Sequence, residues 1–172
     1  MGILTEDMKR TVREQRLAFV ATVCADGTPN LSPKGTIAVW DDDHLIFADL
    51  ASPGTMENLR NNPAIEINVV DAFTRKGYRF KGTATVPTAG PDSAASVQDY
   101  TGPDRGIRTN LTASIRDVVL IKVEYAAPLI SPAYDSGAGE VQVRTQWEEH
   151  WQGITDGFRG RAARASKGEG NT

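Results

Sequence analysis

Along most of the chain, runs of β-branched and aromatic residues alternate with short polar connections. Runs of this composition are typical of strands. In 78–86 apolar and polar residues take turns, as they do in a strand with one buried face. The pattern predicts six strands, at 17–24, 30–40, 44–50, 64–70, 78–86 and 117–125. We therefore expect a mainly β protein with hairpin connections rather than βαβ units.

The connections between these runs predict turns and short helices. Asp26-Gly27 favours a type I′ turn, in which both central residues have positive φ. Thr5 is expected to cap one short helix and Thr55 a second, which Pro63 ends. Further helical patterns lie at 92–100 and 110–116. Six strands joined in this way fit a closed or nearly closed barrel, because closure removes exposed edges.

Length and composition fit one domain. The chain of 172 residues can bury a core without disulfides, and we assign residues 1–152 to this domain. Residues 153–172 combine glycines and basic residues with few apolar ones, which predicts a flexible basic tail.

Charge and residue usage argue against several classes of protein. A formal net charge of −3 gives no reason to expect nucleic acid as a partner. No apolar run reaches the roughly 18 residues of a membrane helix. The single cysteine, Cys24, can form no internal disulfide, so we expect a cytoplasmic protein. One cysteine and two histidines, His44 and His150, also argue against a metal site.

Two polar segments carry the candidate chemistry. In the first, alternation places four polar side chains on one face of a strand and Leu31 with the core on the other. The four are Asn30, Ser32, Lys34 and Thr36. Such a face usually meets solvent, but this one also suits carbonyls and phosphates. The second segment runs from Ser52 to Asn58, where a glycine-containing loop opens a helix. Free N–H groups and the helix dipole bind anions there, although such a start is usually only a cap.

The stretch LIFADLASPGTMENLRNNPAIEINVV has the arrangement strand, S-x-x-T-x-x-N-L-x-x-N-P, strand. On this stretch the chain resembles the FMN-binding split-barrel family, the pyridoxamine 5′-phosphate oxidase-like flavoproteins. The resemblance runs from about Leu17 to Val86, with a weaker echo at 117–135. It implies a six-stranded antiparallel split β-barrel with short peripheral helices.

The resemblance also implies a cofactor and the residues that hold it. The expected cofactor is FMN, and a deazaflavin or haem, which some members use, is the alternative. Many relatives carry lysine, or an arginine and a lysine, where this chain has Gly54 and Thr55. Basic residues elsewhere are expected to compensate. The residues carried over are Ser52, Gly54, Thr55 and Asn58 at the phosphate, Ser32, Lys34 and Thr36 along the flavin, and Arg79 and Lys81 as basic groups nearby.

We expect a flavin-dependent oxidoreductase that acts on a small organic molecule, with NAD(P)H as a candidate electron donor. The flavin supplies the hydride chemistry, so no catalytic residue is assigned. The resemblance implies a homodimer with the cofactor between subunits. Two alternatives stay open: a non-catalytic flavin or tetrapyrrole (haem) carrier, and a cofactor-free interaction module of the same fold.

The remaining candidates have simpler interpretations. Cys24 is expected to be a packed thiol and His44 a surface residue. Trp147 and Trp151, four residues apart, are expected to pack in the core or a dimer interface, with flavin stacking as the alternative. His150 is expected at an interface, with a general-acid role as the alternative.

Overall fold

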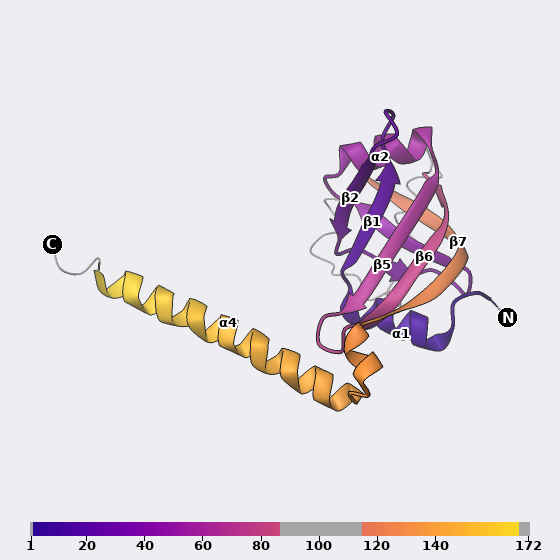
Figure 1. Cartoon of the computed structure of the whole chain (residues 1–172). Helices are drawn as coiled ribbons and strands as arrows, with labels where there is room; N and C mark the ends of the chain where they lie inside the picture. The colour runs from indigo at the N-terminus through magenta and orange to yellow at the C-terminus, as the bar shows by residue number, and fades with distance from the viewer. Residues whose placement is uncertain (1, 87–114, 169–172) are drawn as a thin grey trace. The chain divides into compact units, whose positions relative to one another are not determined.

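The computed structural model describes residues 2–86 and 115–168. The chain forms two compact units, Met1–Val70 with Gly77–Leu129, and Asp71–Lys76 with Ile130–Thr172. The first unit is a curled half-barrel of antiparallel strands (Figure 1), which confirms the predicted fold class. The helical patterns predicted at 92–100 and 110–116 lie outside the described residues.

Seven strands form one sheet in the order β2-β1-β5-β6-β7-β4-β3. They are β1 (Ala18–Val23), β2 (Pro29–Lys34), β3 (Ala38–Val39), β4 (His44–Asp49), β5 (Ala64–Asp71), β6 (Lys76–Thr85) and β7 (Asp117–Ile130). The prediction of six strands is wrong at one place, because the run 30–40 breaks into β2 and β3. These two strands lie at opposite edges of the sheet, so the turn between them carries the chain from one edge to the other.

The turn between β1 and β2 also differs from the prediction. Gly27 has a φ of 82°, but Asp26 is not among the described residues with positive φ, so the turn is not type I′. The Asp26 carboxylate instead accepts hydrogen bonds from the backbone N–H and the hydroxyl of Thr28, at 2.9 and 2.6 Å. This local bond competes with the left-handed conformation that a type I′ turn needs.

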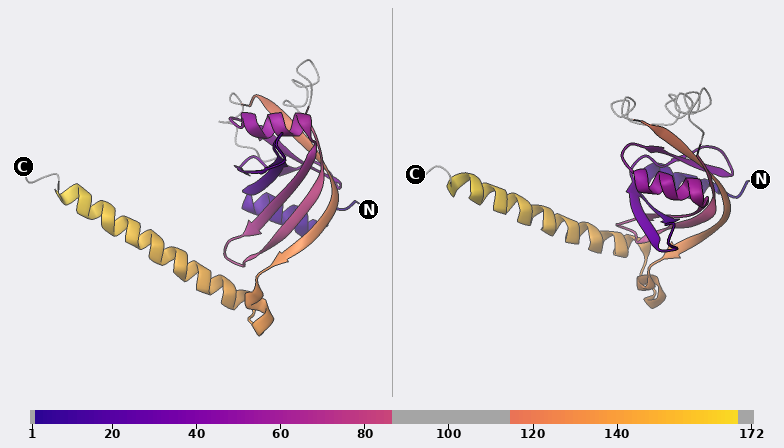
Figure 2. Two further views of the ribbon diagram at one scale, coloured as in Figure 1. Left: turned by 45° about the horizontal axis from the view of Figure 1, so that its top comes forward. Right: turned by 90° about the horizontal axis from the view of Figure 1, so that it is seen from above.

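Helices α1 (Glu6–Gln15) and α2 (Pro53–Asn61) lie at opposite ends of the curled sheet (Figures 1 and 2). Thr5 caps α1 as predicted and accepts a hydrogen bond from the Met8 N–H. The predicted cap of α2 is wrong: the helix begins one turn earlier, with Ser52 at the cap and Pro53 first. Proline favours that position because its fixed φ suits a helix and the missing N–H needs no partner there.

The core lies on the inner side of the curled sheet and includes residues from both helices. Val12 of α1 and Leu59 of α2 share one cluster with the strands. Its largest fully buried side chains are Phe47, Phe80, Leu45, Ile67 and Ile121.

The second unit contains a 3₁₀ helix, Pro132–Ser136, and the long helix α4, Glu140–Gly168. Residues 153–168, expected to be part of a flexible tail, lie in α4. Pairs at helical spacing favour this helix: Gln152 donates to Asp156 at 2.9 Å, and Arg159 pairs with the same carboxylate at 3.7 Å. The domain boundary at residue 152 stays a prediction.

The surroundings of two glycines predict different effects on stability when each glycine is replaced by alanine. A Cβ on Gly82, in β6, would lie 1.9 Å from the Lys122 carbonyl oxygen of β7, whereas one on Gly54 would meet nothing within 4 Å. We expect Gly82→Ala to cost about 1–3 kcal/mol of unfolding free energy, because the backbone of one strand must move. Gly54→Ala should raise the unfolding free energy by less than about 1 kcal/mol, since alanine is the better helix former. Urea unfolding measures both, and an equal loss in the two variants would contradict the packing of β6 against β7.

Candidate functional site

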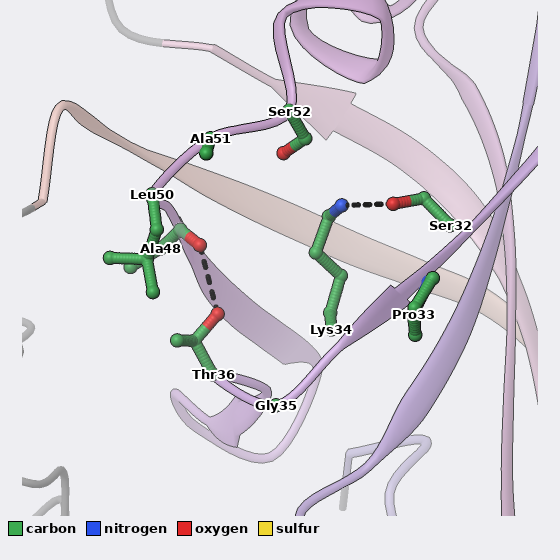
Figure 3. Close-up of a pocket in the computed structure, with 9 residues that line it drawn as sticks. All are labelled: Ser32, Pro33, Lys34, Gly35, Thr36, Ala48, Leu50, Ala51 and Ser52. Atoms are coloured by element: carbon green, nitrogen blue, oxygen red, sulfur yellow. Dashed lines mark hydrogen bonds between the residues drawn. The ribbon is translucent and has the colours of Figure 1, made fainter.

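A pocket of about 180 Å³ lies where the turn after β2 faces the loop from β4 to α2 (Figure 3). One wall is the polar strand segment predicted from the sequence, and the other includes the second predicted segment only at its first residue, Ser52. The pocket is lined by Ser32, Pro33, Lys34, Gly35, Thr36, Ala48, Leu50, Ala51 and Ser52. The structure therefore brings together four of the predicted site residues: Ser32, Lys34, Thr36 and Ser52.

The polar side chains of strand β2 face the inner side of the sheet. The predicted alternation holds, but the expected assignment of faces is wrong: Leu31 is 65% exposed. Ser32 lies opposite Val20 and Lys34 opposite Ala18, and both partners are fully buried. Directly opposite residues share a face of the sheet, so Ser32 and Lys34 lie on the inner side. Alternation gives the period of a strand and not which face is buried, and here the polar face turns toward the pocket.

Lys34 is the most unusual residue of the site, since it is only 5% exposed. Its side chain extends from β2 into the space between Ser32 and Ser52 (Figure 3), and its Nζ donates to Ser32 Oγ at 2.5 Å. Burial lowers the pKa of Lys34, and the negative charge of Asp49 opposes this in part. Among the ion pairs of residues 2–86 and 115–168, none includes Lys34. Within the described part of the chain, its ammonium group thus has a neutral hydroxyl and the Phe47 ring, whose centre lies 5.8 Å from Nζ, as neighbours, and no carboxylate pairs with it.

Asp49 organises the opposite wall and was missed by the sequence analysis. Its buried carboxylate accepts hydrogen bonds from the Ser52 N–H and hydroxyl, at 2.9 and 2.5 Å. These bonds hold the loop that leads into α2. An aspartate at a strand end, three residues before a helix cap, is a usable signal for such an anchor.

Hydrogen bonds decide what the pocket offers to a ligand. The Ser52 hydroxyl donates to Asp49, and Thr36 donates to the Ala48 carbonyl at 2.8 Å. Ser32 accepts from Lys34, so its own proton can point toward a ligand. The pocket therefore combines one cation with a hydroxyl donor, which suits an anionic oxygen.

The structure places Gly54, Thr55 and Asn58 in α2, outside the residues that line the pocket. Thr55 and Asn58 are buried. The Asn58 amide donates to Thr22 Oγ1 at 3.0 Å and to Cys24 Sγ at 3.5 Å. These contacts give Asn58 and Cys24 a packing role beneath the helix.

Arg79 and Lys81 are not brought to the pocket either. Both lie on β6 beside Glu66 of β5, with Arg79 Nε 2.8 Å and Lys81 Nζ 3.2 Å from its carboxylate oxygens. The Arg79 Nε contact lacks the geometry of a hydrogen bond. The single carboxylate of Glu66 therefore pairs with both side chains and balances one of their two positive charges.

The other candidates are not among the residues that line this pocket. His44 pairs with Asp41 at 2.8 Å on the surface. His150 is exposed on α4, with its ring edge-on to Trp147 and Trp151 at centroid distances of 5.1 and 5.7 Å. In the described segments, no helix has both the length and the apolar character needed to cross a membrane.

Several known proteins are similar to this chain in sequence or in structure. HupZ from Group A Streptococcus is 36% identical, and the alignment covers 75% of this chain and 96% of that one with a TM-score of 0.61. An uncharacterised protein of Methanocaldococcus jannaschii is 31% identical over 83 residues, which cover 47% of this chain and 54% of the relative. The chain thus matches about half the length of that relative.

More distant structures share the fold. An FMN-binding protein from Syntrophomonas wolfei is 14% identical, with 73% of this chain and 88% of that chain covered and a TM-score of 0.55. An F420 reductase is 20% identical, with 72% and 98% covered and a TM-score of 0.52. The sequence profile described as pyridoxamine 5′-phosphate oxidase matches residues 4–127, which include β1 to β6 and most of β7. The chain therefore belongs to the pyridoxamine 5′-phosphate oxidase family.

Proposed function

We propose that this protein binds FMN through its phosphate and works as an oxidoreductase on a small organic molecule. The proposal rests on the buried ammonium group of Lys34. A buried ammonium group without a carboxylate partner is costly, and this cost is usually accepted where a site needs the charge. A phosphate dianion in the pocket would pair with Lys34 and accept a hydrogen bond from Ser32.

The pocket fits one end of the cofactor. Its volume of about 180 Å³ is below the roughly 300–1,000 Å³ of sites that enclose a drug-sized ligand. We infer that Ser32, Lys34 and the loop at Ser52 hold the phosphate end and that the ring system extends beyond them. FMN supplies hydride and electron transfer when bound. The protein residues named here bind and orient it.

A second copy of the chain is proposed to complete the site. Four apolar side chains are exposed here: Leu17 just before β1, Phe19 on β1, Leu31 on β2 and Val70 on β5. Phe19 lies opposite Pro33 and Ala21 opposite Leu31, so their side chains share the outer face of the hairpin. An apolar face directly behind the pocket favours a homodimer whose interface lies next to the cofactor.

The first test compares FMN with riboflavin, which lacks the phosphate. We expect purified protein, stripped of ligand, to bind FMN at least tenfold more tightly than riboflavin, because a charge-assisted bond contributes about 1.5–3 kcal/mol. Flavin fluorescence titration measures both affinities. Equal affinities would contradict the phosphate site, and failure to bind either flavin would contradict the cofactor.

Turnover separates an oxidoreductase from a carrier. Bleaching of the bound flavin by NADH or NADPH, followed by reoxidation with an added acceptor, would support the enzyme. A flavin that binds but is not reduced by either donor would support the carrier. Lys34 would pair with the phosphate of FMN or of a deazaflavin, so the phosphate test does not separate the two. Mass spectrometry of the ligand that copurifies distinguishes them.

A further inference from the structure

Helix α4 carries an apolar stripe, formed by Trp147, Trp151, Ile154 and Phe158. Their spacing of four, three and four residues places them within an arc of about 60° on a helix of 3.6 residues per turn. Trp151, Ile154 and Phe158 are 43%, 37% and 62% exposed. The stripe is therefore open to a partner.

Among the described residues, the contacts that join α4 to the rest of its own unit lie at its start. The Arg75 guanidinium lies 3.9 Å from the centre of the Trp147 ring, and Arg144 pairs with Asp71 at 3.0 Å. Asp71 is the last residue of β5, and Arg75 lies in the turn between β5 and β6. These contacts leave the stripe from Trp151 onward uncovered.

The helix also lacks strong intrinsic stability. It contains four glycines, and each of the three inside the helix costs about 1 kcal/mol relative to alanine. Helices of this kind draw their stability from packing of an apolar face. A helix with weak propensity and an exposed stripe thus requires a partner. The glycines are Gly153, Gly157, Gly160 and Gly168.

The charge along α4 indicates what that partner is. Residues 140–156 hold four acidic residues against one basic residue, whereas residues 157–168 hold four basic residues and no acidic one. A second α4 in antiparallel orientation places each acidic half against a basic half, while parallel pairing places like charges together. The charge pattern is therefore complementary to itself in one orientation.

We propose that α4 pairs antiparallel with α4 of a second copy, through Trp151, Ile154 and Phe158. Ile154 is the midpoint of Glu140–Gly168, so the two-fold axis passes near it. Phe158 of one copy then faces the region of Trp151 in the other. This inference does not rest on the proposed flavin function.

Single cysteines in a Cys24→Ser background test the pairing and its direction. Ile154→Cys places two cysteines at the axis, so mild oxidation should link most of the protein into a disulfide dimer on a non-reducing gel. In the antiparallel pair the two copies of Phe158→Cys are separated by about 12 Å along the axis, from the rise of 1.5 Å per residue. That exceeds disulfide reach, and Phe158→Cys should stay monomeric on the gel.

Gln152→Cys, on the opposite side of α4, measures linking by random collision and should give less than a fifth of the Ile154→Cys dimer. Equal linking at Ile154 and Gln152 would overturn the pairing. Equal linking at Ile154 and Phe158 would overturn the antiparallel direction. Co-sedimentation with phosphatidylserine vesicles, in protein whose Ile154→Cys form does not link, would assign the stripe to a lipid surface instead. Thermal melting of each variant confirms that a negative result comes from folded protein.

Discussion

Replacing Lys34 with methionine is expected to weaken FMN binding about 10- to 100-fold, because one or two charge-assisted hydrogen bonds to the phosphate are lost. The same change should raise the unfolding free energy of the ligand-free protein. Methionine fills the space without the cost of a desolvated ammonium group, and among the described residues Lys34 has a hydrogen bond to Ser32 but no ion pair that would be lost. Loss of function with a gain in stability is typical of a residue kept for its chemistry.

The Lys34→Met substitution should also change how the unfolding free energy depends on pH. Burial lowers the pKa of Lys34 below its ordinary value of 10.5, so the unfolded chain binds this proton more tightly than the folded one. Stability then rises as the pH increases from the lowered pKa toward 10.5. The Lys34→Met variant lacks this contribution. Urea unfolding of both proteins at several pH values between 7 and 10 measures the difference.

Lys122→Met is the matched control, because Lys122 lies exposed on β7. It should change neither FMN affinity nor the slope of stability with pH. A Lys34→Met variant that loses stability and keeps its FMN affinity would show that Lys34 supports the fold. That result would contradict the proposed phosphate site.

The strands were predictable because their alternation is a local property of the sequence. Strand β6 illustrates this, since its alternating side chains meet the core on one side and solvent on the other. The break between β2 and β3 was not predictable in the same way. Gly35 permits a turn but does not require one, and the break exists because the chain must pass between two sheet edges that are set by distant strands.

The candidate site was predictable where it depends on local features of the sequence, and not where it depends on tertiary packing. The segments at Lys34 and Ser52 were recognised from residue type and spacing, and the structure places both beside one pocket. Which face of β2 turns inward depends on the partner strand β1, which local pattern does not report. The role of Asn58 depends on the rotation of α2 over Thr22, and that too is set by tertiary packing.

Helix α4 shows how a local signal can be hidden. Its glycines and basic residues suggested a flexible tail, whereas the stripe at Trp151, Ile154 and Phe158 has helical spacing. Composition averages over the segment and loses this spacing. The apolar period is the better guide when a few large side chains are placed among many polar ones.

Asn58→Asp is expected to reduce the unfolding free energy by about 3–5 kcal/mol, because it leaves an uncompensated charge in a buried site. Asn58 is 8% exposed, and its amide donates to Thr22 and Cys24. A carboxylate has no proton to donate there and loses its hydration. For a chain of this size the loss corresponds to a fall in Tm of roughly 6–20 °C.

The pH dependence identifies the cause. Burial raises the pKa of a carboxyl group above its unfolded value of about 3.9, so the penalty is full above the raised pKa and fades as the pH falls toward 3.9. Asn61→Asp, at the exposed end of the same helix, should cost less than about 1 kcal/mol at any pH. Thermal melts at pH 4.5 and 8 compare the variants.

The same pair of variants decides between two roles for Asn58. The resemblance to the family implied a contact with the phosphate, whereas the structure gives the amide two partners inside the protein. If the structural role holds, folded Asn58→Asp protein binds FMN with unchanged affinity below its melting temperature. If Asn58 touches the phosphate, the new carboxylate repels it and the affinity falls even where the variant is fully folded, because like charges a few ångströms apart disfavour each other strongly in a partly buried site.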